Sequence, residues 1–580
     1  MRIVYVEIDH FRGIKKLRWA PSAGVNCLIG PGDSAKTTIL DAIELVLNPR
    51  SYSFADDSDF YGLDYNTPVN IVLTVGELPP GFVSDDRYGL HLRGWNGVAL
   101  KLEDEPGTGL DDVLSLRVTI DRSHEARWSL FNERIATDTE SDPPALRYKD
   151  ARQLASTRLG PYAERHLGWG RLSVLNRLED NTETFSGQLA DASRAARDAF
   201  TRGNPEIFKK TAARAEVLGK HFSVPVRERY VAELDVKGVS LTAGGVSLHD
   251  GKLPLRCLGT GSSRLIVSAL QHGAGSSHVA LIDEIEHGLE PHRIARLLKY
   301  LASSQSESEQ ASLPQMFITT HSPVVIRELK ASDIFAVRSS NGLVQVRSVL
   351  TTARSPNDAQ RHMRAVPDSF LARKIIVCEG RTEQGLTRGL DLYWSKDDKH
   401  ESFALRGTTA VDGNGSGGAP ILADHLSSLG YDVFLLLDSD EPVAPSILKA
   451  LSLKGVLFHE WAGGCSVEER IFLDVPWAMV SSLIALAIES VTSDSVQAQI
   501  NKMCRTQNLP EVTSLHFSPS LNTPAFRTVL GKAAKNDSRP WFKDISRGER
   551  VGELIGPCLE KVADTPLAQG LSALRKWIDE

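Results

Sequence analysis

Two apolar stretches of this chain end in acidic residues, and this pairing restricts the fold more than any other feature. The first stretch, which begins at Ile375, ends in Glu379, and Glu383 follows one turn later; the second ends in Asp438 and Asp440. Each pattern predicts a buried strand whose carboxyl end carries the acids. Because the carboxyl ends of neighbouring parallel strands meet at one edge of a sheet, we expect an α/β domain with a cluster of oxygen ligands suited to Mg²⁺.

A surface loop is the ordinary alternative for Asp438 and Asp440, since acidic residues commonly follow a core strand. Two strands with matching acidic ends favour a metal site instead. A glycine-rich stretch, 412–418, lies between the two strands in the sequence.

The composition is that of an ordinary soluble globular protein, with 41% hydrophobic and 24% charged residues over 580 positions. That length predicts two to four domains. The longest apolar stretch, near 477–491, is too short and too polar to span a bilayer, and the N-terminus starts a strand at once, without a signal peptide. Six cysteines without CxxC spacing are typical of reduced core residues. We therefore expect a cytoplasmic protein with no membrane partner.

The net charge of −7 gives no overall attraction to nucleic acid. Local basic patches can still bind DNA, and two candidates lie within 147–177 and 532–550. A solvated helix face is the alternative explanation for both.

A phosphate-binding loop is predicted near the N-terminus, between a strand at 25–29 and an apolar helix from Ile39 to Leu47. In such a loop successive backbone N–H groups cradle phosphate, Lys36 reaches the β and γ oxygens, and the Thr37 hydroxyl binds Mg²⁺. The residues of this cradle are Gly30, Gly32, Asp33, Ser34, Ala35, Lys36, Thr37 and Thr38.

Ala35 stands where such loops usually carry a second glycine. Its Cβ either costs about 1 kcal/mol, if the position needs a positive φ, or narrows the cradle. We expect tight ATP binding with weak hydrolysis.

Three further motifs follow in the order that a nucleotide-binding domain requires. A small-residue loop precedes a helix and predicts a second anion site; it comprises Gly259, Thr260, Gly261 and Ser262. A buried strand then ends in Asp283, a ligand for the Mg²⁺ shell, and Glu284, which orients or deprotonates water. A later strand ends at His321, placed to sense a γ-phosphate.

In this order the four motifs resemble the ABC-type ATPase head of the SMC, Rad50 and RecF group. The resemblance implies that two heads sandwich ATP, with the 259–262 loop of one chain capping the nucleotide on the other. It therefore implies a homodimer or a higher homo-oligomer.

The domains are predicted from changes in composition. Residues 1–350 form the ABC-type ATPase domain, with a helical insertion at about 151–225 whose role, in dimerisation, DNA contact or packing, is left open. Residues 351–368, polar and with two prolines, are the linker. Residues 369–580 form a second α/β domain with a helical C-terminal region.

The acidic pattern of this second domain resembles the Toprim fold of topoisomerases, primases and a group of nucleases. An ABC head followed by Toprim resembles the OLD (overcoming lysogenization defect) family, including the nuclease subunit of Gabija-type anti-phage systems. This resemblance implies a Ser-x-Glu motif, matched by Ser466 and Glu468, and a late lysine. We assign the lysine to Lys543, with Lys535 and Lys532 as rivals. An ordinary helix start is the alternative for Ser466 and Glu468.

The implied catalytic residues are Glu379, Asp438, Asp440, Glu468 and Lys543, with Glu284 in the ATPase. The carboxylates, together with Glu383 and Ser466, would hold one or two Mg²⁺ or Mn²⁺ ions that activate water for phosphodiester hydrolysis.

The leading hypothesis is therefore an ATP-binding, metal-dependent DNA endonuclease in anti-phage defence, with a helicase or another defence protein as a candidate partner. The alternative is an ATP-dependent DNA clamp or repair scaffold of the RecF or SMC type that binds DNA without cutting it. Strand passage and primer synthesis are disfavoured, because the chain shows no tyrosine domain and no zinc motif.

Overall fold

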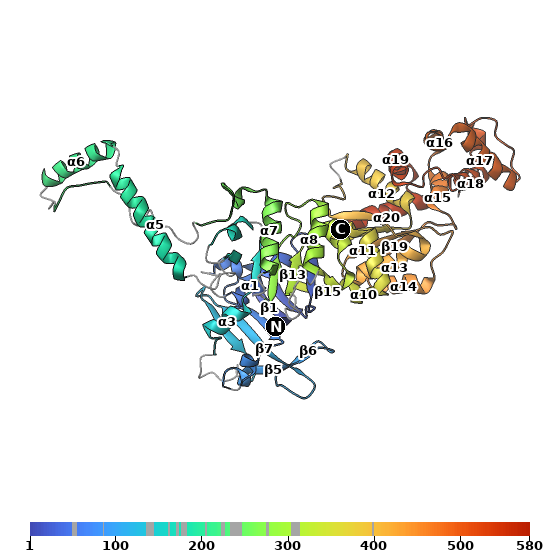
Figure 1. Cartoon of the computed structure of the whole chain (residues 1–580). Helices are drawn as coiled ribbons and strands as arrows, with labels where there is room; N and C mark the ends of the chain where they lie inside the picture. Colours follow the sequence, from blue (N-terminus) through green and yellow to red (C-terminus); the bar gives the residue numbers. More distant parts are fainter. Residues whose placement is uncertain are drawn as a thin grey trace. The chain divides into compact units, whose positions relative to one another are not determined.

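The computed structural model (Figure 1) describes residues 1–48, 55–84, 86–134, 144–160, 163–169, 173–175, 183–203, 206–221, 227–232, 246–273, 278–302, 314–396, 400–536 and 538–580. The chain forms two compact units. The first unit contains Met1–Phe11 and Ile39–Ile318, and the second contains Arg12–Thr38 and Thr319–Glu580. The domain boundaries drawn from the sequence stay a prediction.

The first unit contains a set of antiparallel strands in the order β6-β5-β7-β4-β1, with β8 on β7. Alternating buried and half-buried residues along β1 are typical of a strand with one face in the core. A second, parallel set has the order β13-β12-β9. The bounds are β1 Arg2–Phe11, β4 Val69–Gly76, β5 Leu92–Asn96, β6 Lys101–Glu103, β7 Asp111–Ile120, β8 Ala126–Phe131, β9 Thr157–Leu159, β12 Val279–Ile282 and β13 Gln315–Thr319.

The predicted helical insertion contains two long helices, α5 and α6, whose described side chains are mostly exposed. Parts of this stretch, including 176–182 and 222–225, lie outside the described residues. Three other helices begin at or shortly after predicted nucleotide motifs: α1 at Lys36, α7 at Thr260 and α8 after the loop that follows Asp283. The bounds are α1 Lys36–Leu47, α3 Tyr148–Leu154, α5 Glu183–Arg202, α6 Glu206–His221, α7 Thr260–Gly273 and α8 Pro291–Ala302.

The second unit contains two sheets, the first in the order β2-β15-β14-β3. In it β14 pairs antiparallel with β15 and parallel with β3, which leads into the phosphate-binding loop. The bounds are β2 Ile14–Trp19, β3 Val25–Ile29, β14 Ile334–Ser340 and β15 Leu343–Ser348.

The segment 351–368, expected to be a linker, is largely helical. It contains the second half of α10 (Val349–Thr352) and all of α11 (Pro356–Ala365), and it leads into a 3-10 turn at Pro367–Leu371. Both prolines lie in the first turn of their helix, where the missing N–H costs no hydrogen bond. A composition rich in proline and polar residues is thus compatible with a packed helical segment.

A buried histidine pair joins α11 to α13 (Gly415–Ser428). His362 Nδ1 and His425 Nδ1 are 3.0 Å apart, and His425 Nε2 lies 2.9 Å from the Val349 carbonyl. Burial, followed by the neighbouring His425, lowers the pKa of His362 to about 4.

This low pKa predicts acid sensitivity. Between the unfolded value of roughly 6.5 and about 4, the unfolded chain binds more protons, so stability falls as the pH falls through that window, by up to about 3 kcal/mol. His362→Asn should flatten the dependence of the free energy of unfolding on pH between 6.5 and 4.5, measured by denaturant titration. His516→Asn, at an exposed position, is the control; equal slopes for wild type and His362→Asn would contradict the assignment.

The second sheet of this unit has four parallel strands in the order β17-β16-β18-β19, separated in the sequence by helices. The two strands expected from the acidic pattern are confirmed as β16 and β18. The bounds are β16 Lys374–Cys378, α12 Arg381–Trp394, β17 Thr408–Asp412, α13 Gly415–Ser428, β18 Asp432–Leu437, α14 Pro445–Leu453 and β19 Leu457–Glu460.

A helical region completes this half of the chain, and its apolar side chains form one core with those of β16, β18 and α12. The predicted α/β fold with a helical C-terminal extension is confirmed. The bounds are α15 Val467–Asp474, α16 Trp477–Val491, α17 Ser493–Thr506, α18 Pro524–Ala534, α19 Ile545–Ile555 and α20 Pro566–Asp579.

In the described part of the chain, no single helix is long and apolar enough to cross a membrane. The bent pair α16 and α17, which meet at 116°, passes that test together, by length and composition alone.

Glycines let the backbones of α12 and α19 touch. A Cβ on Gly385 or Gly389 would overlap backbone atoms of α19, and one on Gly548 would lie 2.6 Å from the Thr382 carbonyl oxygen. Gly552 meets the Leu386 carbonyl in the same way. This contact fixes α12 against α19, and α12 begins at the acidic edge of the sheet. It was not predicted from the sequence.

Candidate functional site

The phosphate-binding loop has the predicted strand–loop–helix setting between β3 and α1. The Lys36 ammonium is buried and donates to Gly30 O at 3.0 Å, Pro31 O at 2.7 Å and Ser34 Oγ at 3.1 Å. These contacts place the cation inside the loop, at the centre of a ring of backbone groups.

Two backbone positions fix the shape of this loop. Gly30 has φ 142°, and a Cβ there would lie 2.5 Å from the Val337 carbonyl oxygen of β14, so only glycine fits. Ala35 has φ 72°, in the left-handed region. The departure from the usual glycine therefore falls at a position that needs a positive φ.

Ala35→Gly should stabilise the protein. A non-glycine residue in the left-handed region costs about 1–2 kcal/mol, and glycine removes this cost. Glycine also has greater freedom in the unfolded chain, which offsets part of the effect, so the expected net gain in the free energy of unfolding is about 0.5–1 kcal/mol. Thermal unfolding measures this gain. Ala42→Gly, the same change inside α1, should destabilise instead; loss of stability in both variants would contradict the strain.

In the first unit, Asp283 follows β12, as predicted, and it pairs with Arg158. Arg158 lies in the basic patch within 147–177 that was a candidate for DNA binding. Arg158 donates to Asp283 Oδ2 at 3.1 Å and to Glu44 at 2.8 Å, and it also pairs with Asp41. Although burial opposes its charge, these carboxylates raise the pKa of Arg158 above its ordinary value. Arg158 is thus a structural cation of the ATPase rather than a free DNA contact.

A second arginine, Arg264 of α7, is fully buried and hydrogen-bonds to the backbone at Asp283 and Glu284. It donates to the carbonyls of Asp283 and Glu284 at 2.8 and 2.9 Å. At the start of α7, Gly261 packs against the backbone of Gly288 so closely that a Cβ would overlap it. The loop at 259–262 and the loop after Asp283 therefore hold each other in position.

The remaining predicted ATPase residues lie at strand ends. Glu284 has φ 47° and an exposed side chain 3.6 Å from His287 Nδ1. His321 follows β13 and is exposed, while the preceding Thr320 is buried and accepts a hydrogen bond from the Ser322 N–H at 3.0 Å.

The acidic residues of the second domain meet at the carboxyl edge of the parallel sheet. Glu379 follows β16 and Asp438 follows β18, and the Asp438 N–H donates to Glu379 Oε2 at 2.8 Å. Asp438 Oδ1 accepts from the Val467 N–H at 2.9 Å. Burial raises the pKa of Glu379; burial and then Glu383, Glu468 and Glu379 raise the pKa of Asp438.

Glu383 and Glu468 lie in the first turns of α12 and α15 and are both buried. Burial and then Glu468 raise the pKa of Glu383. The Thr382 hydroxyl donates to Glu468 Oε1 at 2.9 Å. Burial together with the neighbouring carboxylates thus raises the pKa of Glu383 and of Asp438, and a divalent cation would relieve the repulsion between these charges.

Ser466 is the N-cap of α15. Its hydroxyl accepts from the Glu469 N–H at 3.4 Å, and Glu469 returns a bond to the Ser466 N–H at 3.0 Å. The helix-start explanation accounts for Ser466, whereas Glu468 is turned into the acidic cluster.

Of the candidate lysines, Lys535 at the end of α18 lies beside an acid of the cluster, whereas Lys543, the lysine preferred from the sequence, does not. The Lys535 ammonium pairs with Asp440 Oδ2. Lys543 is exposed, and among the described residues no ion pair joins it to an acid. Sequence spacing could not choose between them, because α18 and the loop after it bring distant positions to the sheet edge.

The glycine-rich loop of the sequence supports Glu379 from the other side. The N–H groups of Gly413 and Gly415 donate to the carbonyls of Cys378 and Glu379 at 2.7 and 2.8 Å, and Asn414 is left-handed with φ 65°. A Cβ on Gly413 would overlap Ala419, so the tight turn requires glycine. The start of α13 thereby fixes the end of β16.

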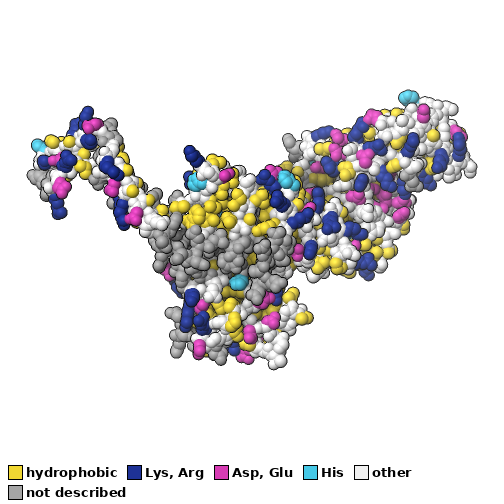
Figure 2. All heavy atoms as spheres, in the orientation of Figure 1, with side chains coloured by type: hydrophobic (Ala, Val, Ile, Leu, Met, Phe, Trp, Pro, Cys, Tyr) yellow, Lys and Arg dark blue, Asp and Glu magenta, His cyan; other side chains and the backbone are white. Residues whose placement is uncertain are grey.

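The donor set fits a divalent cation in chemistry. Figure 2 shows acidic side chains gathered on the visible face of the C-terminal half, bordered by Lys and Arg side chains. Carboxylate oxygens are the ligands that Mg²⁺ and Mn²⁺ prefer. Within the described residues, however, no group of three or more His, Cys, Asp or Glu side chains is arranged so that it could already hold a metal ion.

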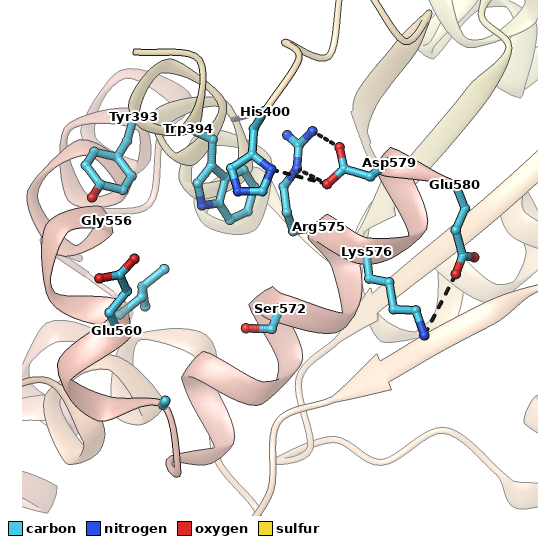
Figure 3. A pocket seen from close by; sticks show the side chains of 12 residues that line it. Tyr393, Trp394, His400, Gly556, Glu560, Ser572, Arg575, Lys576, Asp579 and Glu580 are labelled. Carbon is cyan, nitrogen blue, oxygen red and sulfur yellow. Dashed lines mark hydrogen bonds and ion pairs between the residues drawn. The ribbon is translucent and has the colours of Figure 1, made fainter. Parts of the chain in front are cut away.

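A cavity of about 650 Å³ lies in the second unit, away from the acids (Figure 3). Trp394 lines it at the end of α12, about 16 Å along the helix axis from Glu383. Its central cation, Arg575, pairs with Asp579 and lies over the Trp394 ring at 5.4 Å. Arg575 and Asp579 thus neutralise each other within the chain, and the lining contains none of the acids at the sheet edge.

Two protein-family models match the chain. Residues 25–327, more than half of the 580, match the model described as "AAA domain, putative AbiEii toxin, Type IV TA system". Residues 370–440 match the model described as "Overcoming lysogenization defect protein-like, TOPRIM domain". No curated protein matches the chain.

Solved structures with similarity to the chain include SMC head domains and a recombination mediator protein. The SMC head domain from Thermotoga maritima is 14% identical with a TM-score of 0.27, covering 60% of this chain and 99% of that one. The Smc head domain with an extended coiled coil derived from Pyrococcus furiosus is 13% identical with a TM-score of 0.34, covering 59% and 95%. The recombination mediator protein RecF with ATP is 14% identical with a TM-score of 0.33, covering 60% and 99%.

Proposed function

We propose a function from the premise that this chain belongs to the AAA-domain family of the putative AbiEii toxins and is an OLD-family protein with an ATPase and a Toprim domain: it is an ATP-binding, divalent-metal-dependent DNA endonuclease. The observation that carries the proposal is the acidic cluster, in which the half-buried carboxylates of Glu379 and Asp438 and the buried carboxylate of Glu468 meet at one sheet edge, with Lys535 beside Asp440.

In this reaction Glu379, Asp438 and Asp440 would hold one or two Mg²⁺ or Mn²⁺ ions, with Glu383 and Glu468 completing the shell. A bound ion supplies Lewis acidity and lowers the pKa of a water molecule. The Lys535 ammonium, released from Asp440, would neutralise charge on the phosphate. The backbone N–H of Asp438 and the loop at 413–415 keep the Glu379 carboxylate in position.

Cleavage of a supercoiled plasmid tests this proposal. Purified protein with Mn²⁺ or Mg²⁺ should convert the plasmid to nicked or linear DNA, and excess EDTA should stop the conversion. A full panel of metals, nucleotides and DNA substrates without any cut would contradict it.

ATP would control cleavage rather than drive a motor. The strained Ala35 in the phosphate-binding loop supports tight binding with slow turnover, as expected of a sensor. Fast steady-state ATP hydrolysis by the purified protein would contradict this part of the proposal. The loop at 259–262, held against Gly288, would face a nucleotide on a second chain in a homodimer or a higher homo-oligomer. An anti-phage role, with a helicase or other defence protein as partner, follows from the family resemblance.

One observation favours the second candidate function, an ATP-dependent DNA clamp or scaffold that does not cut. The described acids are close enough to interact, but they do not form a closed cage. DNA binding that is strengthened by ATP, without cleavage in any metal, would support that alternative.

A further inference from the structure

The phosphate-binding loop and the Toprim sheet both contact one strand, β14, and both contacts lie within the second unit. On one side, β3 pairs with β14 as far as Ile29 and Ala336. The next residue of β14, Val337, has its carbonyl against Gly30, the first residue of the phosphate-binding loop. The glycine requirement at position 30 shows how close this approach is.

The next residue along β14, Arg338, contacts the Toprim sheet. Its guanidinium lies over the ring of Tyr431 at 4.7 Å and donates to the Arg373 carbonyl at 3.4 Å. Tyr431 immediately precedes β18, which ends at Asp438. Arg373 immediately precedes β16, which ends at Glu379. One side chain therefore contacts the amino ends of both strands that carry the metal-binding acids.

Tyr431 is a firm partner for this contact. It is buried, and its hydroxyl donates to the Phe370 carbonyl at 2.6 Å, so the ring cannot swing away without losing that bond. The neighbouring strand adds a second link, since Arg347 of β15 donates to the Ser428 carbonyl at the end of α13 at 2.7 Å. The other end of α13 holds Glu379.

Nucleotide binding has to change the contacts of Lys36 within the phosphate-binding loop, which touches β14 at Val337. All three donors of the Lys36 ammonium are matched by groups of the loop itself, Gly30 O, Pro31 O and Ser34 Oγ. A phosphate that binds Lys36 must displace at least one of them. One of them, the Gly30 carbonyl, belongs to the residue that touches Val337.

We propose that β14 relays the state of the nucleotide site to the Toprim acids, with Arg338 as the residue that couples the strand to β16 and β18. This inference rests on the proposed nuclease function for its biological meaning, but not for its physical test. Movement at Gly30 shifts Val337, and Arg338 passes the shift to Tyr431 and Arg373. The acids at the far ends of β16 and β18 then change their spacing, and with it their capacity to close around an ion.

Hydrogen–deuterium exchange tests the relay without any need for cleavage. In the wild type, a non-hydrolysable ATP analogue should change exchange by about fivefold or more in 373–379 and 431–438, the scale of ordinary allosteric coupling. Arg338→Ala should bind the same analogue with unchanged affinity, measured with a fluorescent nucleotide, but lose the change in both Toprim segments. Lys330→Ala, which removes an exposed cation shortly before β14, should behave as the wild type.

Cleavage provides a second readout. If the protein cuts DNA, Arg338→Ala should keep its metal-dependent activity but respond to ATP by less than about 1.5-fold, against about fivefold or more in the wild type. An exchange response in Arg338→Ala equal to the wild type would overturn the relay, as would a nucleotide-bound wild type without any change in the two segments. Absence of cleavage with an intact exchange response would count against the nuclease and leave the relay standing.

Discussion

Asp438→Asn is expected to lower metal-dependent DNA cleavage by at least about 100-fold, because it removes a charged ligand from the centre of the acidic cluster. The amide oxygen can still accept the Val467 N–H, which Asp438 binds at 2.9 Å, so the fold around α15 should persist. Plasmid cleavage in Mn²⁺ measures the loss.

A stability measurement separates lost metal binding from lost structure. An ion present at 100 times its dissociation constant should stabilise the wild type by about 2.7 kcal/mol, and Asp438→Asn should show little of this effect. Asp432→Asn, an exposed acid at the opposite end of β18, is the matched control and should resemble the wild type in both assays. Full cleavage by Asp438→Asn would show that the catalytic acids lie elsewhere.

Gly389→Val is expected to destabilise the Toprim half by about 3 kcal/mol or more. A side chain at this position would overlap the backbone of Glu549, so α12 and α19 must separate. Because α12 begins beside the acids and carries Glu383, this separation should also weaken the site. Thermal unfolding should show the transition of this unit lowered by roughly 5–10 °C.

Gly187→Ala is the control for the glycine effect. Gly187 lies in α5 with no atom near its missing Cβ, so a methyl group there should leave stability unchanged or raise it by up to about 1 kcal/mol. A Gly389→Val protein as stable as the wild type would show that the two helices can part at no cost.

The sequence was sufficient for features that depend on local pattern. The strands before Glu379 and Asp438, the loop before Lys36 and the strand before Asp283 are each short apolar runs followed by a diagnostic residue, and each is present in the structure. The positive φ at Ala35, one of the two alternatives that the sequence left open, is a local property of the same kind.

Features that depend on packing between distant segments were not predictable in this way. The choice between Lys535 and Lys543 depends on how α18 meets the sheet edge, almost 100 residues after Asp440. Arg158 looked like a surface cation, because nothing in its local sequence shows the carboxylates of α1 and β12 around it. The contact between α12 and α19 depends on two pairs of glycines, Gly385 and Gly389 in α12 and Gly548 and Gly552 in α19. The two pairs are far apart in the sequence, so the sequence does not show that they face each other.

Anomalous diffraction from Mn²⁺-soaked crystals tests the central claim most directly. The account predicts a peak within ligand distance of the carboxylates of Asp438 and Glu379, with a second peak near Asp440 if two ions bind. A crystal of Asp438→Asn should lack the first peak. Manganese bound only elsewhere on the wild-type chain, with this sheet edge empty at saturating concentration, would contradict a metal-dependent Toprim site.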